Sequence, residues 1–71
     1  MKSEATIRSI HQTLGKAALF AQRDGDNESY EVLANCAIAL GWVLDLPSFQ
    51  EPFEDLIKGA NWAANGGAHV N

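Results

Sequence analysis

The sequence predicts an all-α fold, an antiparallel helical hairpin followed by a shorter third helix. Apolar residues recur every three or four positions in three segments, and clusters of turn-forming residues separate these segments. No segment alternates apolar with polar side chains as a half-buried strand does. We therefore expect helices near residues 3–23, 27–44 and 49–64, joined by short connections in a single small domain of residues 1–71.

The first predicted helix begins at Ser3, a residue type that caps helix N-termini well. One apolar stripe runs along it, formed by Ile7, Ile10, Leu14, Ala17, Ala18 and Ala21. Polar and basic side chains lie opposite, as expected for a helix that packs on one side. Gly15 costs about 1 kcal/mol relative to alanine inside a helix, so either close packing or simple tolerance must account for it.

The second predicted helix follows the turn Asp24-Gly25-Asp26-Asn27, in which Asp26 or Asn27 can serve as the N-cap. Its first stripe contains Tyr30, Leu33, Ala34, Ala37, Leu40 and Leu44, and a second stripe at another angle contains Val32, Cys36, Ala39 and Val43. From Cys36 onward the helix is apolar all round, and so short a chain offers few elements to cover it. We therefore predict a homodimer that completes a helical bundle through the residues Val32, Cys36, Ala39, Trp42 and Val43.

The third predicted helix starts after Pro47, which lacks the backbone donor that would continue the second one. Ser48 and Glu51 fit a capping box that would open the third helix, whereas Pro52 favours a start slightly later. Its apolar face contains Phe49, Phe53, Leu56, Ile57, Ala60 and Ala64. Asn65-Gly66-Gly67 is a strong stop signal, and the residues beyond it are expected to fray.

Charge is distributed unevenly along the chain. Nine acids and five bases give a net charge of −4, yet residues 1–23 carry +3 and residues 24–71 carry −7. This balance argues against direct nucleic-acid binding, which requires a basic patch. It fits helices that attract one another within a dimer, helix faces that are solvated differently, or a surface that steers a partner.

The chain has none of the usual signals of secretion or membrane insertion. The N-terminal residues contain no long apolar core, and the nearly apolar run from Val32 to Leu44 has 13 residues. A bilayer crossing needs about 20. The single cysteine, Cys36, excludes an internal disulfide, and its apolar neighbours suggest a buried side chain rather than a reactive thiol. A cytoplasmic location with no membrane partner is therefore expected.

No group of side chains has the spacing that catalysis, metal binding or cofactor binding requires. His11 and His69 are 58 positions apart, and with one cysteine they cannot supply the four ligands of a zinc site. In the acidic turn after residue 23, the positions that calcium loops reserve for glycine and glutamate hold Ser29 and Asn35. We expect a nonenzymatic chain without catalytic residues, cofactor or metal, in which His11 is a boundary residue with a satisfied ring nitrogen.

Several large apolar side chains fall outside the predicted stripes. Leu19 projects among polar residues of the first helix, and Trp62 lies opposite the apolar face of the third, near Asp55. We predict that Trp62, Leu19 and Asp55 bind another protein, because aromatic side chains of this kind are enriched at interface centres. The alternative is that the third helix unwinds and turns Trp62 inward. For Trp42 and Phe20, an ordinary core position is favoured over an interface.

Three short runs in the hairpin carry a resemblance. Arg23-Asp24-Gly25-Asp26 is followed by Tyr30-Glu31-Val32-Leu33 and then by Ala39-Leu40-Gly41-Trp42-Val43-Leu44. Over residues 8–46 this pattern resembles small phage or prophage-encoded helical-hairpin proteins, whose second helix ends in a Trp-Val-Leu pattern. The resemblance implies a protein that binds and modulates a host protein.

Two classes of function fit these observations. The first, which we favour, is a noncatalytic protein-binding module, such as a phage-type inhibitor or adaptor, that docks on a second protein through an apolar and aromatic patch rimmed by acids. The alternative is an acidic regulator or DNA mimic that acts on a basic nucleic-acid-binding protein. Salt discriminates the two, because a mimic should lose affinity steeply as salt rises whereas apolar docking should not.

Overall fold

The computed structural model describes residues 1–66 of the chain. Its helices are α1 (Glu4–Arg23), α2 (Asn27–Val43) and α3 (Gln50–Ala64), with a short 3-10 turn, η1 (Pro47–Phe49), before α3. These bounds confirm the all-α prediction, and no strand occurs within residues 1–66. The bundle completed by dimerisation stays a prediction, and the expected fraying beyond residue 67 lies outside the described residues.

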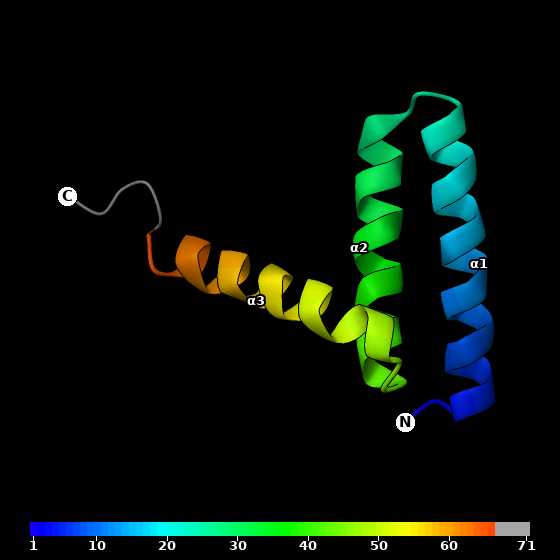
Figure 1. The fold of residues 1–71 in the computed structure, drawn as a ribbon, viewed down its shortest axis with the longest axis horizontal. Coiled ribbons are helices and arrows are strands. Elements are labelled where there is room, and N and C mark those ends of the chain that lie inside the picture. Colours follow the sequence, from blue (N-terminus) through cyan, green and yellow to red (C-terminus); the bar gives the residue numbers. More distant parts are fainter. Residues whose placement is uncertain (67–71) are drawn as a thin grey trace.

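α1 and α2 form an antiparallel hairpin, and α3 leaves the foot of the hairpin sideways (Figure 1). α2 contacts both other helices, whereas α3 has no contact with α1 in the described part of the chain. The extents of the chain, 45 × 32 × 21 Å, agree with this L-shaped outline. The third helix therefore adds no layer to the hairpin.

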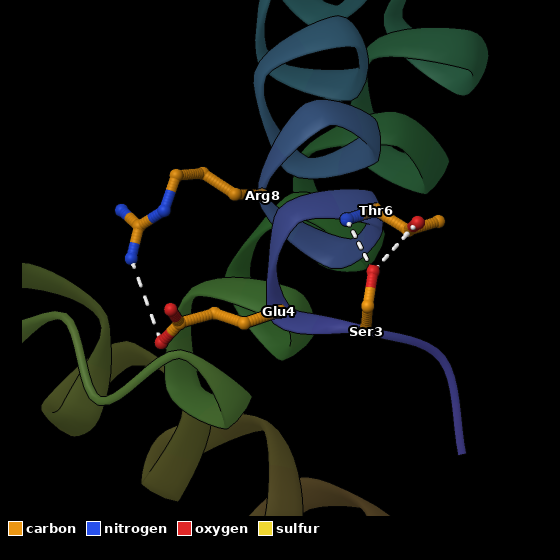
Figure 2. Close-up of polar contacts among 4 residues, drawn as sticks. All are labelled: Ser3, Glu4, Thr6 and Arg8. Atoms are coloured by element: carbon orange, nitrogen blue, oxygen red, sulfur yellow. Dashed lines mark hydrogen bonds and ion pairs between the residues drawn. The ribbon is translucent and has the colours of Figure 1, made fainter.

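The first turn of α1 is closed by the side chain of Ser3, as predicted (Figure 2). Its Oγ accepts a hydrogen bond from the Thr6 backbone N–H at 3.2 Å and donates one to Thr6 Oγ1 at 2.9 Å. Arg8 Nη2 lies 3.9 Å from Glu4 Oε1, and an exposed pair at this distance adds little stability. At Gly15 no packed atom lies within 4 Å of the position that a Cβ would take, so tolerance rather than close packing accounts for this glycine.

The turn between α1 and α2 ends one helix and starts the next. Gly25 adopts the left-handed conformation (φ 74°), and the Asp26 N–H bonds to the Ala21 carbonyl at 2.9 Å, as in a Schellman motif. The Asp26 carboxylate then caps α2 by accepting a hydrogen bond from the Ser29 N–H at 3.1 Å. Hydrogen bonds from the Ser29 hydroxyl first, and from its backbone N–H second, lower the pKa of Asp26 below its usual value of 3.8. The acidic turn is therefore a helix cap exposed to solvent.

α2 ends in a second Schellman motif with an aspartate in the position that Gly25 occupies in the first. Asp45 has a φ of 59°, and its N–H bonds to the Trp42 carbonyl at 3.0 Å. The Leu46 N–H bonds to the Gly41 carbonyl at 3.0 Å. The chain thus reverses direction through a residue that has to adopt the left-handed conformation despite its Cβ.

The start of α3 decides between the two predicted helix starts: the capping box at Ser48 is wrong, and the later start is confirmed. Ser48 forms no capping box, because it lies within η1 and Phe49 stands at the N-cap position without a side-chain capping bond. The later start that Pro52 favours is the one observed: α3 begins at Gln50, and Pro52 lies in its first turn.

Few side chains are fully buried. Ala18 of α1 and Ala37 of α2 are the only apolar residues with less than a tenth of their surface exposed in residues 1–66, at 6% and 7%. Larger residues along the seam, such as Leu14, Leu33 and Leu40, are only half-buried. The hairpin is therefore a thin two-helix layer with large apolar side chains on its outer faces.

Candidate protein-binding surfaces

The first candidate surface is the α2 stripe, formed by Val32, Cys36, Ala39 and Val43. An α-helix turns by about 100° per residue, which places these four side chains within about 60° of one another. Val32 is 63% exposed, Val43 is 42% exposed, Cys36 is exposed and Ala39 is half-buried. The structure therefore brings four of the five predicted self-association residues onto one open side of α2, within the uncharged run from Val32 to Val43.

Trp42, the fifth of these residues, lies in the corner between α2 and α3. Its indole stacks on the Phe53 ring of α3, with ring centroids 4.3 Å apart and an interplanar angle of 17°. α3 covers one face of the indole, and Trp42 remains 42% exposed. Trp42 thus joins α3 to the hairpin and is separate from the α2 stripe.

Besides Trp42, which is 42% exposed although a core position was favoured for it, two further side chains that were expected to be buried are exposed. Phe20 is 59% exposed because α3 runs away from α1 and leaves that end of the hairpin uncovered; the Arg23 guanidinium lies 5.8 Å from its ring centroid. Cys36 is exposed because it faces outward on the α2 stripe. A single copy of the chain therefore leaves both side chains accessible.

The predicted protein-binding set is divided between two helices. Trp62 is 62% exposed, and α3 stays helical through Ala64, so the indole does not turn inward. Asp55 is exposed on the same helix, and the interval of seven residues places it on the same side as Trp62. Leu19, 59% exposed, belongs to α1, which α3 does not contact within residues 1–66. Trp62 and Asp55 thus share one surface, and Leu19 lies on another.

That other surface is the hairpin groove, a depression of about 560 Å³ between α1 and α2. Small residues from both helices line it: Gly15, Ala18, Ala34 and Ala37. Leu19 and Ile38 add larger apolar side chains, and Phe49 closes one end. The sequence analysis missed this groove, although the intervals of three residues from Gly15 to Ala18 and from Ala34 to Ala37 are its signal.

His11 joins the two helices at the end of the groove near Phe49. Its Nδ1 lies 2.9 Å from the Ala37 carbonyl oxygen, and its ring meets the Phe49 ring edge-on, with centroids 4.9 Å apart at 88°. This contact confirms the prediction of a boundary histidine with a satisfied ring nitrogen. Its geometry gives His11 a structural role in the packing of α1, α2 and η1.

The described residues contain no cluster of three or more His, Cys, Asp or Glu side chains that could hold a metal ion. Among residues 1–66, none of the helices combines the length and the apolar run that a bilayer crossing requires. Comparison of the chain with family models, with curated proteins and with solved structures finds no match. The resemblance to phage-encoded hairpin proteins accordingly stays a prediction.

Proposed function

We propose that this chain is a noncatalytic protein-binding module that works with its apolar faces covered by partner chains. One observation carries the proposal: the large apolar side chains lie on the outside. Leu19, Phe20, Val32 and Trp62 are each 59–63% exposed, whereas the residues buried most deeply within residues 1–66 are alanines and a glycine. Soluble single chains rarely leave apolar patches of this kind in water unless a partner covers them.

A homodimer through the α2 stripe is part of this function. The four residues of the stripe carry no charge, and Glu28 lies one turn before Val32, so an antiparallel two-fold contact of stripe with stripe sets no like charges against each other. Such a contact removes Val32, Cys36 and Val43 from water, and two hairpins packed in this way form a four-helix bundle. The dimer would thereby cover the outward side of α2 that a single copy leaves open.

A second protein would dock on the Trp62 side of α3. α3 projects away from the hairpin (Figure 1), and Trp62 on it is 62% exposed. Tryptophan is the residue type most enriched at interface hot spots, and Asp55 beside it supplies an acidic rim. This role agrees with the resemblance to small phage-encoded proteins that bind a host protein.

Affinity capture with the wild-type chain, Trp62→Ala and the matched surface variant Asn61→Ala tests the Trp62 surface. We expect the wild type and Asn61→Ala to retain the same protein, Trp62→Ala to lose it, and added salt to change little. Equal capture by all three chains would contradict docking through Trp62. Retention that falls steeply with salt would instead favour the acidic regulator or DNA mimic.

Sedimentation equilibrium at micromolar concentration tests the α2 stripe. Val43→Asp places a charge in the stripe and is expected to weaken the dimer, because burying an unpaired carboxylate is unfavourable. Ser9→Asp, which adds the same charge on the exposed side of α1, is the matched control and should leave the mass unchanged. A wild-type chain that sediments only at 7.7 kDa would contradict self-association.

A further inference from the structure

We infer that Asn65 is a site of spontaneous deamidation, in which the backbone nitrogen of Gly66 attacks the side-chain amide of Asn65. The inference is independent of the proposed function, because it concerns a reaction of the chain itself and needs no partner. Three observations carry it: the pair Asn65-Gly66, its position at the end of α3, and the exposure of Asn65 to water.

The reaction is a ring closure followed by hydrolysis. The Gly66 backbone nitrogen forms a bond to Asn65 Cγ and gives up its proton, while the bond from Cγ to the side-chain nitrogen breaks. That nitrogen takes up the proton and leaves as ammonia. Water then adds to either carbonyl carbon of the succinimide ring and opens it, which yields aspartate or isoaspartate. Water is the only co-reactant, and no atom is oxidised or reduced.

A glycine after the asparagine removes the main obstacle to ring closure. The attacking nitrogen has to come close to the preceding side chain, and a Cβ on the attacking residue would crowd this approach. Gly66 has no Cβ, and it adopts the left-handed conformation with a φ of 92°. No packed atom lies within 4 Å of the position that a Cβ would take there. Neighbouring parts of the described chain therefore do not crowd the reacting bond either.

The last turn of α3 holds this peptide bond only weakly. Asn65 is the C-cap residue, with a φ of −92° and a ψ of 17°. The Gly66 N–H is bonded to the Ala63 carbonyl oxygen at 3.1 Å. Ring closure requires rotation about the Cα–C bond of Asn65 and costs this hydrogen bond. Because helix ends fray more readily than helix interiors, the reactive conformation is accessible without unfolding α3.

The other asparagines of the described residues are protected by comparison. Asn27, Asn35 and Asn61 each lie within a helix, and each precedes a residue that carries a side chain. At these positions the attacking nitrogen is crowded, and rotation of the backbone would interrupt a helix. The three asparagines therefore serve as internal controls within the same chain.

Asp24-Gly25, at the end of α1, has a similar backbone but a different reactivity. Asp24 is a C-cap residue, and Gly25 has a φ of 74°. A carboxylate is a poorer target for the attacking nitrogen than an amide, because it carries a negative charge. The turn is also closed by the Asp26 N–H, which is bonded to the Ala21 carbonyl oxygen at 2.9 Å. Asn65 is therefore the more reactive of the two helix ends.

Deamidation changes the charge at the end of α3. It adds one negative charge to a chain whose net charge is −4. The new carboxylate lies at the helix C-terminus, where the helix dipole disfavours negative charge. Trp62, which is 62% exposed, lies about one turn earlier on the same helix. The reaction therefore weakens the last turn of α3 and alters the electrostatics of the surface around Trp62.

Peptide mapping by mass spectrometry tests the site in the full chain. The protein is incubated at mildly alkaline pH in water labelled with heavy oxygen and is then digested in ordinary water. We expect Asn65 to convert to aspartate and isoaspartate with uptake of heavy oxygen and release of ammonia, while Asn27, Asn35 and Asn61 stay amides. Fragmentation of the peptide after Lys58 separates Asn65 from Asn61. An Asn65 amide that persists as long as the other three would overturn the inference.

Two glycine variants test the attacking nitrogen. Gly66→Ala should slow the conversion of Asn65, because the added Cβ crowds the nitrogen. The matched control Gly67→Ala makes the same change one peptide bond farther along and should react like the wild type. Equal rates for the two variants would overturn attack by Gly66. Repeating the comparison in guanidinium chloride keeps the test valid if alanine disturbs the turn at position 66.

The unfolded wild type tests the role of the helix end. In guanidinium chloride the rate of conversion at Asn65 reports the local sequence alone, without the fold. We expect the folded chain to convert Asn65 at a similar rate, since only one hydrogen bond at the end of α3 has to open. A folded chain that keeps Asn65 intact while the unfolded chain converts it would show that α3 protects the site, and the inference would be wrong.

Discussion

Gly41 of α2 lies directly against the Phe49 side chain, with no space for a Cβ between them. A Cβ at position 41 would stand 2.9 Å from Phe49 Cβ and closer still to its ring. Gly41 is itself buried in a helix interior, where glycine is otherwise unfavourable. This contact seats η1 on the end of α2 and thereby sets the direction in which α3 leaves the hairpin.

Gly41→Ala should therefore destabilise the fold although alanine is the better helix former. We expect a loss of about 1–2 kcal/mol in the free energy of unfolding, because the overpacking cost exceeds the gain in helix propensity. Urea denaturation followed by circular dichroism at 222 nm, a helix signal, measures it.

Gly15→Ala is the matched control, because no packed atom lies within 4 Å of the added Cβ. This variant should gain about 0.5–1 kcal/mol from helix propensity. Equal shifts for the two alanine variants would show that the Gly41–Phe49 contact does not restrict position 41.

Local signals in the sequence predicted the helix bounds well, because caps and turns act over a few residues. Ser3, Asp26 and Gly25 each close a helix end as expected. Ser48 failed as a cap because Pro47 begins a 3-10 turn that delays α3. The start of a helix after a proline depends on how the intervening turn packs, here through Phe49 on Gly41.

The surfaces were predicted only in part, because hydrophobic periodicity shows which side chains share a face and not which faces are covered. The α2 stripe and the outward Trp62 followed from helical spacing alone. The exposure of Phe20 did not, since it depends on where α3 goes. The groove also depends on α3, which would have filled it if the chain had folded into a three-helix bundle.

Asp45→Gly should stabilise the chain. Asp45 has a φ of 59°, a conformation that costs an ordinary L-residue about 1–2 kcal/mol and that glycine adopts freely. Because aspartate tolerates this region better than most residues, we expect a gain of about 0.5–1 kcal/mol in thermal or urea unfolding. Asp24→Gly is the control, because Asp24 has a φ of −83° and its replacement by glycine relieves no left-handed strain. A similar gain in stability for Asp24→Gly would contradict strain at Asp45 as the cause.

The Asp26 cap should make stability depend on pH in the acid range. Hydrogen bonds from Ser29 lower the pKa of Asp26 in the folded chain, so the folded state favours the carboxylate relative to the unfolded state. This stabilisation is fully present above the usual pKa of 3.8 and is lost as the pH falls through the lower folded value. We expect the difference in unfolding free energy between the wild type and Asp26→Asn to fall with acidification, because asparagine caps without titrating. A difference that is constant from neutral to strongly acidic pH would contradict this role.

The two tryptophans should respond oppositely to truncation. Trp42→Ala removes the stack on Phe53 and should lower the unfolding free energy by about 1–3 kcal/mol, less than a fully buried tryptophan would cost. Trp62→Ala should leave the thermal midpoint nearly unchanged, since its indole has no packed partner ring among the described residues and is 62% exposed. Binding to a second protein should then weaken by about 2 kcal/mol or more, the size of a hot spot.

Acrylamide quenching checks the exposure of Trp62 without a partner. In a Trp42→Phe background, which keeps an aromatic ring against Phe53, the remaining fluorescence comes from Trp62 alone. Quenching close to that of free indole is expected, because the side chain stands in water on the outer side of α3. If self-association buried Trp62, its emission would shift to the blue and its quenching would fall as protein concentration rises. A protected indole at all concentrations would instead place Trp62 in a core, and Trp62→Ala would then cost about 3–5 kcal/mol in stability.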